Sequence, residues 1–202
     1  MSTRARALLR SIALISALTL VAPFAAASDA ENFVKAKQSE LIEMVKKSKG
    51  AADDRKIEDA FDSVLDYDAL AKDSLAEAWA DRTPDERAEF QGVLKKLVRA
   101  AYRKSLKRIS DYTVEIKGES PAESGHIVHT VAKSKTDNRQ EPVSIDYVVH
   151  QVDGKWRVAD IVTEGSSLVT NYRNQFRRII KKNGFPELIK RMKAKLDKGD
   201  VN

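Results

Sequence analysis

Three histidines are the residues of this chain whose type is most typical of metal binding or acid–base chemistry. His126 and His129 are three apart in a strand-like segment, so their side chains point to opposite faces. His129 and His150 fall on two predicted strands and could be cross-strand neighbours. No nearby acid completes an obvious ligand set, so we interpret the histidines as surface or half-buried residues and predict no metal site.

Asp160 is the one carboxylate whose setting suggests catalysis, because it lies among apolar residues of a predicted strand. It has no recognisable catalytic partner, and we favour a polar contact with Arg173 or Tyr172. Ser166 and Ser167 stand in an EGSS turn, which differs from the G-x-S-x-G nucleophile elbow and suits a helix N-cap. The sequence therefore favours a protein that is not an enzyme, and an enzyme using Asp160 remains an alternative.

The composition excludes several other classes of function. The 202-residue chain has no cysteine, which excludes thiol catalysis, disulfides and cysteine-ligated zinc. It has no glycine-rich phosphate loop, and aromatic residues make up only 6% of it, so base-stacking platforms are not indicated. The net charge of +6 belongs partly to Arg4, Arg6 and Arg10 at the start of the chain. The charge is therefore weak support for a nucleic-acid partner.

Residues 1–27 have the three parts of a secretory signal peptide. The basic start is followed by an apolar run over residues 11–24, which is shorter than the roughly 20 residues that span a bilayer. Three alanines at 25–27 supply the small residues of a cleavage site. We predict cleavage after Ala27, which leaves a single domain over residues 28–202 in the periplasm.

Helical periodicity is present on both sides of a group of predicted strands. Apolar residues recur at helical spacing over residues 29–49, 56–65, 83–110, 168–182 and 185–196. Thr83, Pro84 and Glu86 have the spacing of a capping box, and Asp68 could cap a short helix that includes Leu75 and Trp79. Long helices are thus expected to flank the strands.

Four strands are expected over residues 112–117, 126–134, 143–152 and 155–163. Residues 118–125 are expected to form a turn region, and Asp153-Gly154 is a strong signal for a tight hairpin. These elements predict an α+β fold, in which N- and C-terminal helices wrap a twisted antiparallel sheet of about four strands.

One pattern of motifs consists of Tyr147, the segments 154–158, 160–161, 164–167 and 171–176, and Gly184. Together these residues resemble the MlaC family of periplasmic phospholipid-binding proteins, also called toluene-tolerance proteins. Upstream segments at 66–68, 75–79 and 90–102 fit the same pattern. One position departs from it, since Ala76 stands where a glycine is expected.

This resemblance implies a carrier that serves an ABC transport system maintaining outer-membrane lipid asymmetry. Its cargo would be a diacyl phospholipid, held in an apolar pocket between sheet and helices, and no cofactor would be needed. The implied partners are an outer-membrane lipoprotein complex and an inner-membrane ABC transporter with an MCE-domain subunit. The carrier itself would be a monomer. A periplasmic binding protein for another apolar ligand, such as a hopanoid or quinone, is the alternative.

Periodicity alone leaves open whether the apolar faces close on each other or around a guest. On the resemblance, we expect the apolar residues of the sheet, the long helix and the helix after the last hairpin to contact lipid. These candidate residues are Leu94, Leu97, Val98, Tyr102, Val114, Ile116, Val128, Val143, Ile145, Tyr147, Val149, Trp156, Val158, Val169, Tyr172, Phe176 and Ile180.

Overall fold

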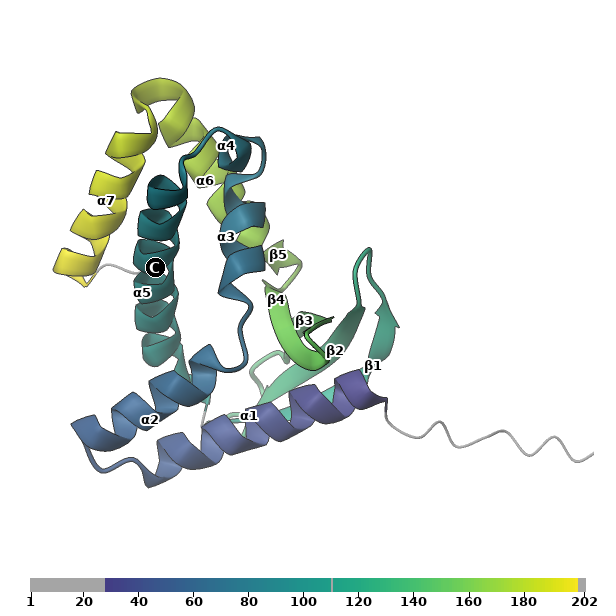
Figure 1. Ribbon diagram of the computed structural model, residues 1–202. Helices are drawn as coiled ribbons and strands as arrows, with labels where there is room; N and C mark the ends of the chain where they lie inside the picture. Colours follow the sequence, from purple (N-terminus) through teal and green to yellow (C-terminus); the bar gives the residue numbers. More distant parts are fainter. Residues whose placement is uncertain (1–27, 110, 200–202) are drawn as a thin grey trace, which may run out of the picture.

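The computed structural model describes residues 28–109 and 111–199 and has the predicted α+β architecture (Figure 1). The proposed signal peptide lies outside these residues. Within them, five strands form one antiparallel sheet in the order β1-β2-β3-β4-β5. The strands are β1 (Tyr112–Pro121), β2 (His126–Ser134), β3 (Val143–Val152), β4 (Lys155–Thr163) and β5 (Ser166–Ser167). The first four are the predicted strands, and the two-residue β5 adds a short edge beside β4.

Seven helices lie within the described residues. α1 (Asp29–Lys47) runs across the sheet, and the later helices form a second group beside it (Figure 1). The others are α2 (Ala51–Asp62), α3 (Tyr67–Leu75), α4 (Glu77–Ala80), α5 (Pro84–Ile109), α6 (Leu168–Asn183) and α7 (Phe185–Lys198). No helix of the described chain is both long enough and apolar enough to cross a membrane.

The β3–β4 hairpin confirms the predicted turn. Val152 pairs with Lys155, and the two residues between them have positive φ angles, 50° at Asp153 and 72° at Gly154. Two left-handed central residues match the right-handed twist of the flanking strands, which is why an Asp-Gly pair suits this position.

β1 is longer than expected, because residues 118–121 continue the strand and do not form a turn. A β-bulge at Lys117 shifts the register between the pairs Ile116–Thr130 and Gly118–His129. The bulge absorbs one extra residue and the strand then resumes pairing as far as Pro121. Only the last part of the predicted turn region, around residues 122–125, reverses the chain.

Side-chain caps begin most of the helices where the sequence indicates. Ser28 Oγ accepts from the Glu31 amide at 3.1 Å, and Ser167 Oγ accepts from the Thr170 amide at 3.0 Å. α3 is capped by Asp66, whose carboxylate accepts from the amides of residues 68 and 69, so the expectation of an Asp68 cap was wrong. Asp66 reaches two free amides because it lies just outside the first turn.

α2 starts and ends earlier than the expected range of 56–65. Its start at Ala51 adds two alanines and two acids, which favour a helix N-terminus. Its end is set by tertiary contacts, because Val64 O accepts from the Val158 amide at 2.8 Å and the Asp66 amide donates to Val158 O at 2.9 Å. This strand-like pairing with β4 takes residues 64–66 out of the helix.

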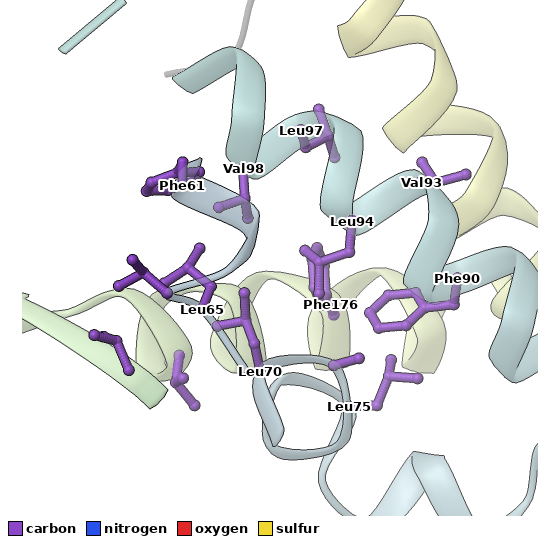
Figure 2. Close-up of a cluster of buried hydrophobic side chains, with 14 of the residues drawn as sticks. Phe61, Leu65, Leu70, Leu75, Phe90, Val93, Leu94, Leu97, Val98 and Phe176 are labelled. Atoms are coloured by element: carbon purple, nitrogen blue, oxygen red, sulfur yellow. The ribbon is translucent and has the colours of Figure 1, made fainter. Parts of the chain in front are cut away.

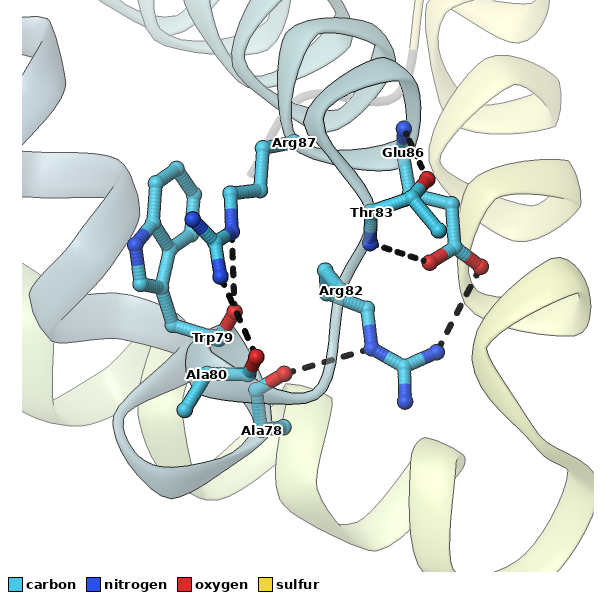
Figure 3. A network of polar contacts seen from close by, with 7 residues as sticks. All are labelled: Ala78, Trp79, Ala80, Arg82, Thr83, Glu86 and Arg87. Carbon is cyan, nitrogen blue, oxygen red and sulfur yellow. Dashed lines mark hydrogen bonds and ion pairs between the residues drawn. The ribbon is translucent and has the colours of Figure 1, made fainter.

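The start of α5 is fixed by a polar network (Figure 3). Thr83 and Glu86 form the predicted capping box, with amide-to-side-chain distances of 2.9 and 3.2 Å. Arg87 donates to the carbonyls of Trp79 and Ala80 at the end of α4, both at 3.1 Å, and its guanidinium lies over the Trp79 ring. The network satisfies the free backbone groups of two helix ends and sets their relative orientation.

Ala76, the position that departs from the family pattern, has φ 49° and ψ −123°, a backbone conformation that L-residues rarely adopt. Such a conformation strains a residue with a Cβ and is available to glycine at little cost. We expect Ala76→Gly to raise the free energy of unfolding by about 1 kcal/mol, the usual size of this strain. Urea denaturation measures this change in the free energy of unfolding. Ala78→Gly in the neighbouring short helix is the control and should not stabilise the protein. Equal effects of the two substitutions would contradict backbone strain at Ala76.

One hydrophobic core joins the helices to the sheet, as expected for a single domain. Figure 2 shows its helical part, where Phe90 of α5 meets Phe176 of α6 edge-on with centroids 5.5 Å apart. The strands contribute Val128, Val149 and Val158, all less than 4% exposed. The core thus ties β2, β3 and β4 to the helices, including α1, which contributes Ala30, Val34 and Leu41.

Candidate functional site

An apolar pocket lies between α1 and the sheet face formed by β3 and β4. Its volume is about 80 Å³. The lining residues come from α1, from the α2–α3 segment, from α5 and from the two strands: Phe33, Val34, Lys37, Gln38, Leu41, Ile42, Phe61, Val64, Leu65, Tyr102, Tyr147, Val158 and Ile161. The pocket therefore draws on elements far apart in the sequence.

The local structure explains how these residues meet. The α1 residues form three successive pairs, at 33–34, 37–38 and 41–42, which repeat every four residues and share one helix face. On the sheet, Tyr147 and Ile161 are directly paired across β3 and β4. The backbone of Val158 is hydrogen-bonded to Val64 and Asp66, in the segment between α2 and α3. The walls are thus a helix stripe facing a cross-strand pair.

Almost no charge reaches this pocket. Tyr147 OH accepts a hydrogen bond from Gln38 Nε2 at 2.9 Å, and burial raises the pKa of Tyr147 despite that bond. Burial, and next the nearby Tyr147, raise the pKa of Tyr102. Both phenols are therefore neutral at physiological pH. Lys37, the only charged side chain among the described lining residues, is paired with Glu40 at 2.7 Å. An uncharged apolar pocket suits an apolar ligand.

Two stacked rings close one end of the pocket. The rings of Phe61 and Tyr102 are nearly parallel, with centroids 3.4 Å apart. Behind them lies a second cavity of about 250 Å³, lined by Val45, Ser48, Asp54, Ile57, Glu58, Phe61, Arg99, Tyr102 and Arg103. Phe61 and Tyr102 line both cavities, so their stack is the wall between an apolar space and a polar one.

Ion pairs hold α2 against α5 beside this wall. Asp62 receives hydrogen bonds from Arg99 and from Tyr67, and it pairs with Lys95 at 2.8 Å. Burial opposes ionisation of Asp62, but the hydrogen bonds from Arg99, Lys95 and Tyr67 outweigh it and lower its pKa to about 2. A second ion pair joins Glu58 to Arg103. Together these pairs fasten the helix that carries Phe61 to the helix that carries Tyr102.

This network predicts a pH-dependent stability. Because the pKa of Asp62 is lower in the folded protein than the usual ~3.9, ionised Asp62 stabilises the fold above that value, and the contribution is lost as the pH falls towards 2. Asp62→Asn should lower the free energy of unfolding at pH 7 by about 1–3 kcal/mol, the range for hydrogen bonds to charged groups. Urea denaturation between pH 2 and 7 should show the difference shrinking at low pH.

The control is Asp59→Asn, an exposed acid of the same helix, which should behave like the wild type. A deficit of Asp62→Asn that is equally large at pH 2 and pH 7 would mean that the lost stability does not come from the ionised carboxylate.

The structure separates the seventeen candidate residues into groups. Tyr102, Tyr147 and Val158 line the pocket. Leu97, Tyr172 and Phe176 line a different groove, between α5, α6 and α7. Five lie in the packed core, namely Leu94, Val98, Val128, Val149 and Val169. The rest are half-buried, namely Val114, Ile116, Val143, Ile145, Trp156 and Ile180. Their contact with lipid stays a prediction.

The pocket residues of α1 and of the α2–α3 segment were missing from the candidates. Phe33, Val34, Leu41 and Ile42 were recognised as the apolar face of a helix, but that face was assigned to no site. The signal in the sequence was the width of this helix face. Apolar or long side chains occur in pairs at each turn, which makes the face wider than packing against one neighbouring element requires.

The polar candidates have structural roles. Asp160 accepts from Ser167 Oγ at 2.5 Å and from the Val169 amide at 3.1 Å, so it holds the start of α6 and does not contact Arg173 or Tyr172 as expected. Arg173 instead donates to the Asp73 carbonyl. The geometry explains the difference, because Asp160 lies on β4 beside the start of α6 and accepts from the Val169 amide of its first turn.

The histidines do not meet, so the idea that His129 and His150 are cross-strand neighbours was wrong. The strand register puts His129 opposite Asp146, while His150 lies 2.7 Å from Asp66, and His126 contacts Glu119. Across residues 28–109 and 111–199, no group of three or more His, Cys, Asp or Glu side chains could hold a metal ion.

The fold and the pocket define a small α+β protein in which helices enclose an apolar space against one face of an open antiparallel sheet. The family model for the MlaC protein matches residues 35–194, which is most of the chain. The chain therefore belongs to the MlaC family.

Among solved structures, the fold is similar to that of a phospholipid-binding protein from Ralstonia solanacearum, determined in complex with a phospholipid. The similarity covers 86% of this chain and 99% of that one, at 24% sequence identity and a TM-score of 0.71. At this identity the match establishes the shared fold.

Proposed function

We propose that this protein is a periplasmic carrier that binds a diacyl phospholipid and moves it between the two membranes, and that it is not an enzyme. The observation that carries the proposal is the uncharged apolar pocket between α1 and the β3–β4 face. Membership of the MlaC family and the fold shared with a phospholipid-binding protein support the same ligand class.

The physical need for such a pocket follows from the hydrophobic effect. Moving two acyl chains of ~16 carbons from a bilayer into water costs about 25 kcal/mol of free energy, at ~0.8 kcal/mol per methylene that is no longer buried. A carrier must shelter the tails nearly as well as the bilayer, yet release them again. Apolar, weakly directional contacts meet both requirements, whereas ion pairs or covalent bonds to the tails would not.

Loading requires the pocket walls to move. At about 80 Å³ the pocket is well below the ~300–1,000 Å³ typical of ligand sites. Its walls belong to separate elements, and a short connection of residues 48–50 joins α1 to α2. We infer that α1 and the Phe61–Tyr102 wall shift outward to admit the tails, while the hydrogen-bonded sheet stays in place.

We propose that the carrier serves a transport system that maintains lipid asymmetry of the outer membrane, and membership of the MlaC family supports this role. We propose that it exchanges phospholipid with an outer-membrane lipoprotein complex and with an inner-membrane ABC transporter that has an MCE-domain subunit. Its exposed basic residues on α7, including Lys190 and Lys193, would favour encounter with anionic surfaces.

Export would require the proposed leader, and the fold gives the predicted cleavage site a physical meaning. Ser28 would be the first residue of the mature chain and already caps α1. Intact-mass measurement of protein from the periplasmic fraction should give residues 28–202. A product that keeps residues 1–27 and sediments with the membranes would contradict a freely moving carrier.

Delipidation tests the proposed function. Removing lipid from natively purified protein should lower the melting temperature and increase binding of a hydrophobic dye, because the tails fill apolar space. Adding back a diacyl phospholipid should reverse both changes. At a hundredfold excess over Kd, it should restore about 2.7 kcal/mol of unfolding free energy. Glycerophosphocholine, which has no tails, should reverse neither. Unchanged melting and dye binding, with no lipid rebound, would contradict the carrier and leave the pocket residues as ordinary core.

A further inference from the structure

A further hollow lies on the other side of α5 from the pocket, between α5, α6 and α7, whose arrangement Figure 1 shows. Its volume is about 620 Å³. It is lined by Leu97, Ala101, Leu168, Asn171, Tyr172, Gln175, Phe176, Ile179, Leu188, Arg191, Met192, Ala194, Lys195 and Lys198. None of these residues lines the pocket under α1, so α5 separates two different spaces. We call this hollow the helical groove.

The α6–α7 hairpin builds the helical groove. Gly184, with φ 82°, ends α6 and lets α7 return alongside it. The lining residues span 168–179 of α6 and 188–198 of α7, so the groove runs towards the end of the hairpin away from Gly184. Eleven helical residues cover about 16 Å. The groove is therefore long enough to hold an extended chain of atoms.

The floor of the groove is apolar and firmly packed. Phe176, Leu188 and Met192 are each at most 3% exposed, and the Tyr172 ring stacks on Phe176 with centroids 5.2 Å apart. Phe176 in turn meets Phe90 of α5 edge-on (Figure 2 shows Phe90 and Phe176). These rings are fixed by the core, so the floor is a preformed apolar surface.

The rim of the groove is positively charged. Among the described lining residues, three are cationic, namely Arg191, Lys195 and Lys198, and none is an acid. Arg191 is paired with Glu187 at 2.8 Å. The side chains of Lys195 and Lys198 make no hydrogen bond or ion pair with any other described residue. An apolar floor thus adjoins two ammonium groups that pair with no carboxylate among the residues that the structure describes.

We propose that the helical groove is a second ligand site, which binds a single-chain anionic amphiphile. The hydrocarbon chain would lie along the half-buried apolar lining residues Leu168, Tyr172 and Ile179 above this floor, and a phosphate or carboxylate head would contact Lys195 and Lys198. The volume is within the ~300–1,000 Å³ of small-molecule sites. Apolar contacts would supply the affinity, and the two lysines would select a negative head over a neutral one.

The site is independent of the proposed phospholipid cargo, because Leu97 and Ala101 face the groove while Tyr102 faces the pocket. One bound ligand of each kind can therefore be present together. The lysine-lined groove would let the protein take up a monoacyl lipid without releasing the diacyl one.

Calorimetric titration of the lipid-loaded protein with dodecyl phosphate, below its micelle concentration, tests the proposal. We expect one site for dodecyl phosphate and at least tenfold weaker binding of the uncharged dodecyl maltoside. The double substitution Lys195→Glu with Lys198→Glu should weaken the binding of dodecyl phosphate at least tenfold. Ala194→Trp should abolish binding, because Ala194 is an exposed wall residue that tolerates a larger side chain and whose indole would fill the groove.

The matched control is Lys181→Glu with Lys182→Glu, which makes the same charge change on exposed α6 residues that do not line the groove. This control should bind dodecyl phosphate within about threefold of wild type, and all variants should keep the wild-type melting temperature and phospholipid content. Equal losses in both double variants would reduce the effect to overall charge and overturn the site. Unchanged binding of dodecyl phosphate in Ala194→Trp would also overturn the site. A loss of binding in Lys195→Glu with Lys198→Glu that is seen only with anionic vesicles would overturn it too, because the lysines would then be a membrane-docking surface.

Discussion

Ile161→Asp should lose at least 99% of the phospholipid that the wild type retains through purification. Ile161 lines the pocket and pairs across the sheet with Tyr147. A carboxylate at this position would have to lie against acyl tails or force water among them, and an unpaired charge in apolar surroundings costs several kcal/mol. Every 1.4 kcal/mol weakens binding tenfold, so a loss of about a hundredfold or more follows. Phosphorus analysis of the purified protein measures it.

Ile127→Asp is the matched control. Ile127 is also a half-buried strand isoleucine, but it lies next to the inward-facing Val128 and so points to the opposite face of β2. This variant should keep most of its phospholipid, and circular dichroism should show both variants folded. Normal lipid content in folded Ile161→Asp would show that the tails lie elsewhere.

Phe61→Ala should have the largest effect on the lipid-free fold and should also change which lipids are bound. Phe61 is 4% exposed and stacks on Tyr102, and truncating such a ring costs about 3–5 kcal/mol of unfolding free energy. The same change removes the wall between the pocket and the cavity lined by Ile57 and Arg99. We expect the bound lipids to shift towards longer acyl chains, as measured by mass spectrometry of extracted lipid.

Phe33→Ala provides the comparison, because Phe33 lines the same pocket but not the second cavity. It should reduce the amount of bound lipid without lengthening the chains. If Phe61→Ala is folded and carries the wild-type range of chain lengths, the stacked rings do not limit the pocket.

The elements were predictable where local chemistry decides them. The Asp153-Gly154 turn, the Thr83–Glu86 capping box and the Ser167 cap each depend on a few neighbouring residues, and all three were confirmed. Errors arose where distant contacts decide. The end of α2 is set by pairing with Val158 of β4, and β1 continues past Gly118 only because β2 accepts a bulge. Neither partner is visible in the local sequence.

The pocket was harder to predict for a related reason. Periodicity shows which side of a helix is apolar, but it does not show which apolar surface that side meets. Tyr102 and Leu97 lie on the same predicted stripe of α5, yet one lines the pocket and the other lines the helical groove. The face of α1 was visible in the sequence, but its role depends on how α1 lies across the sheet, which only the three-dimensional arrangement provides.

Native mass spectrometry of the periplasmic protein, purified without detergent, tests the carrier most directly. We predict a folded species of residues 28–202 with one added mass that matches a diacyl phospholipid, and the loss of that mass in Ile161→Asp but not in Ile127→Asp. A wild-type protein at its bare polypeptide mass, or one carrying an apolar ligand without phosphorus, would contradict the account.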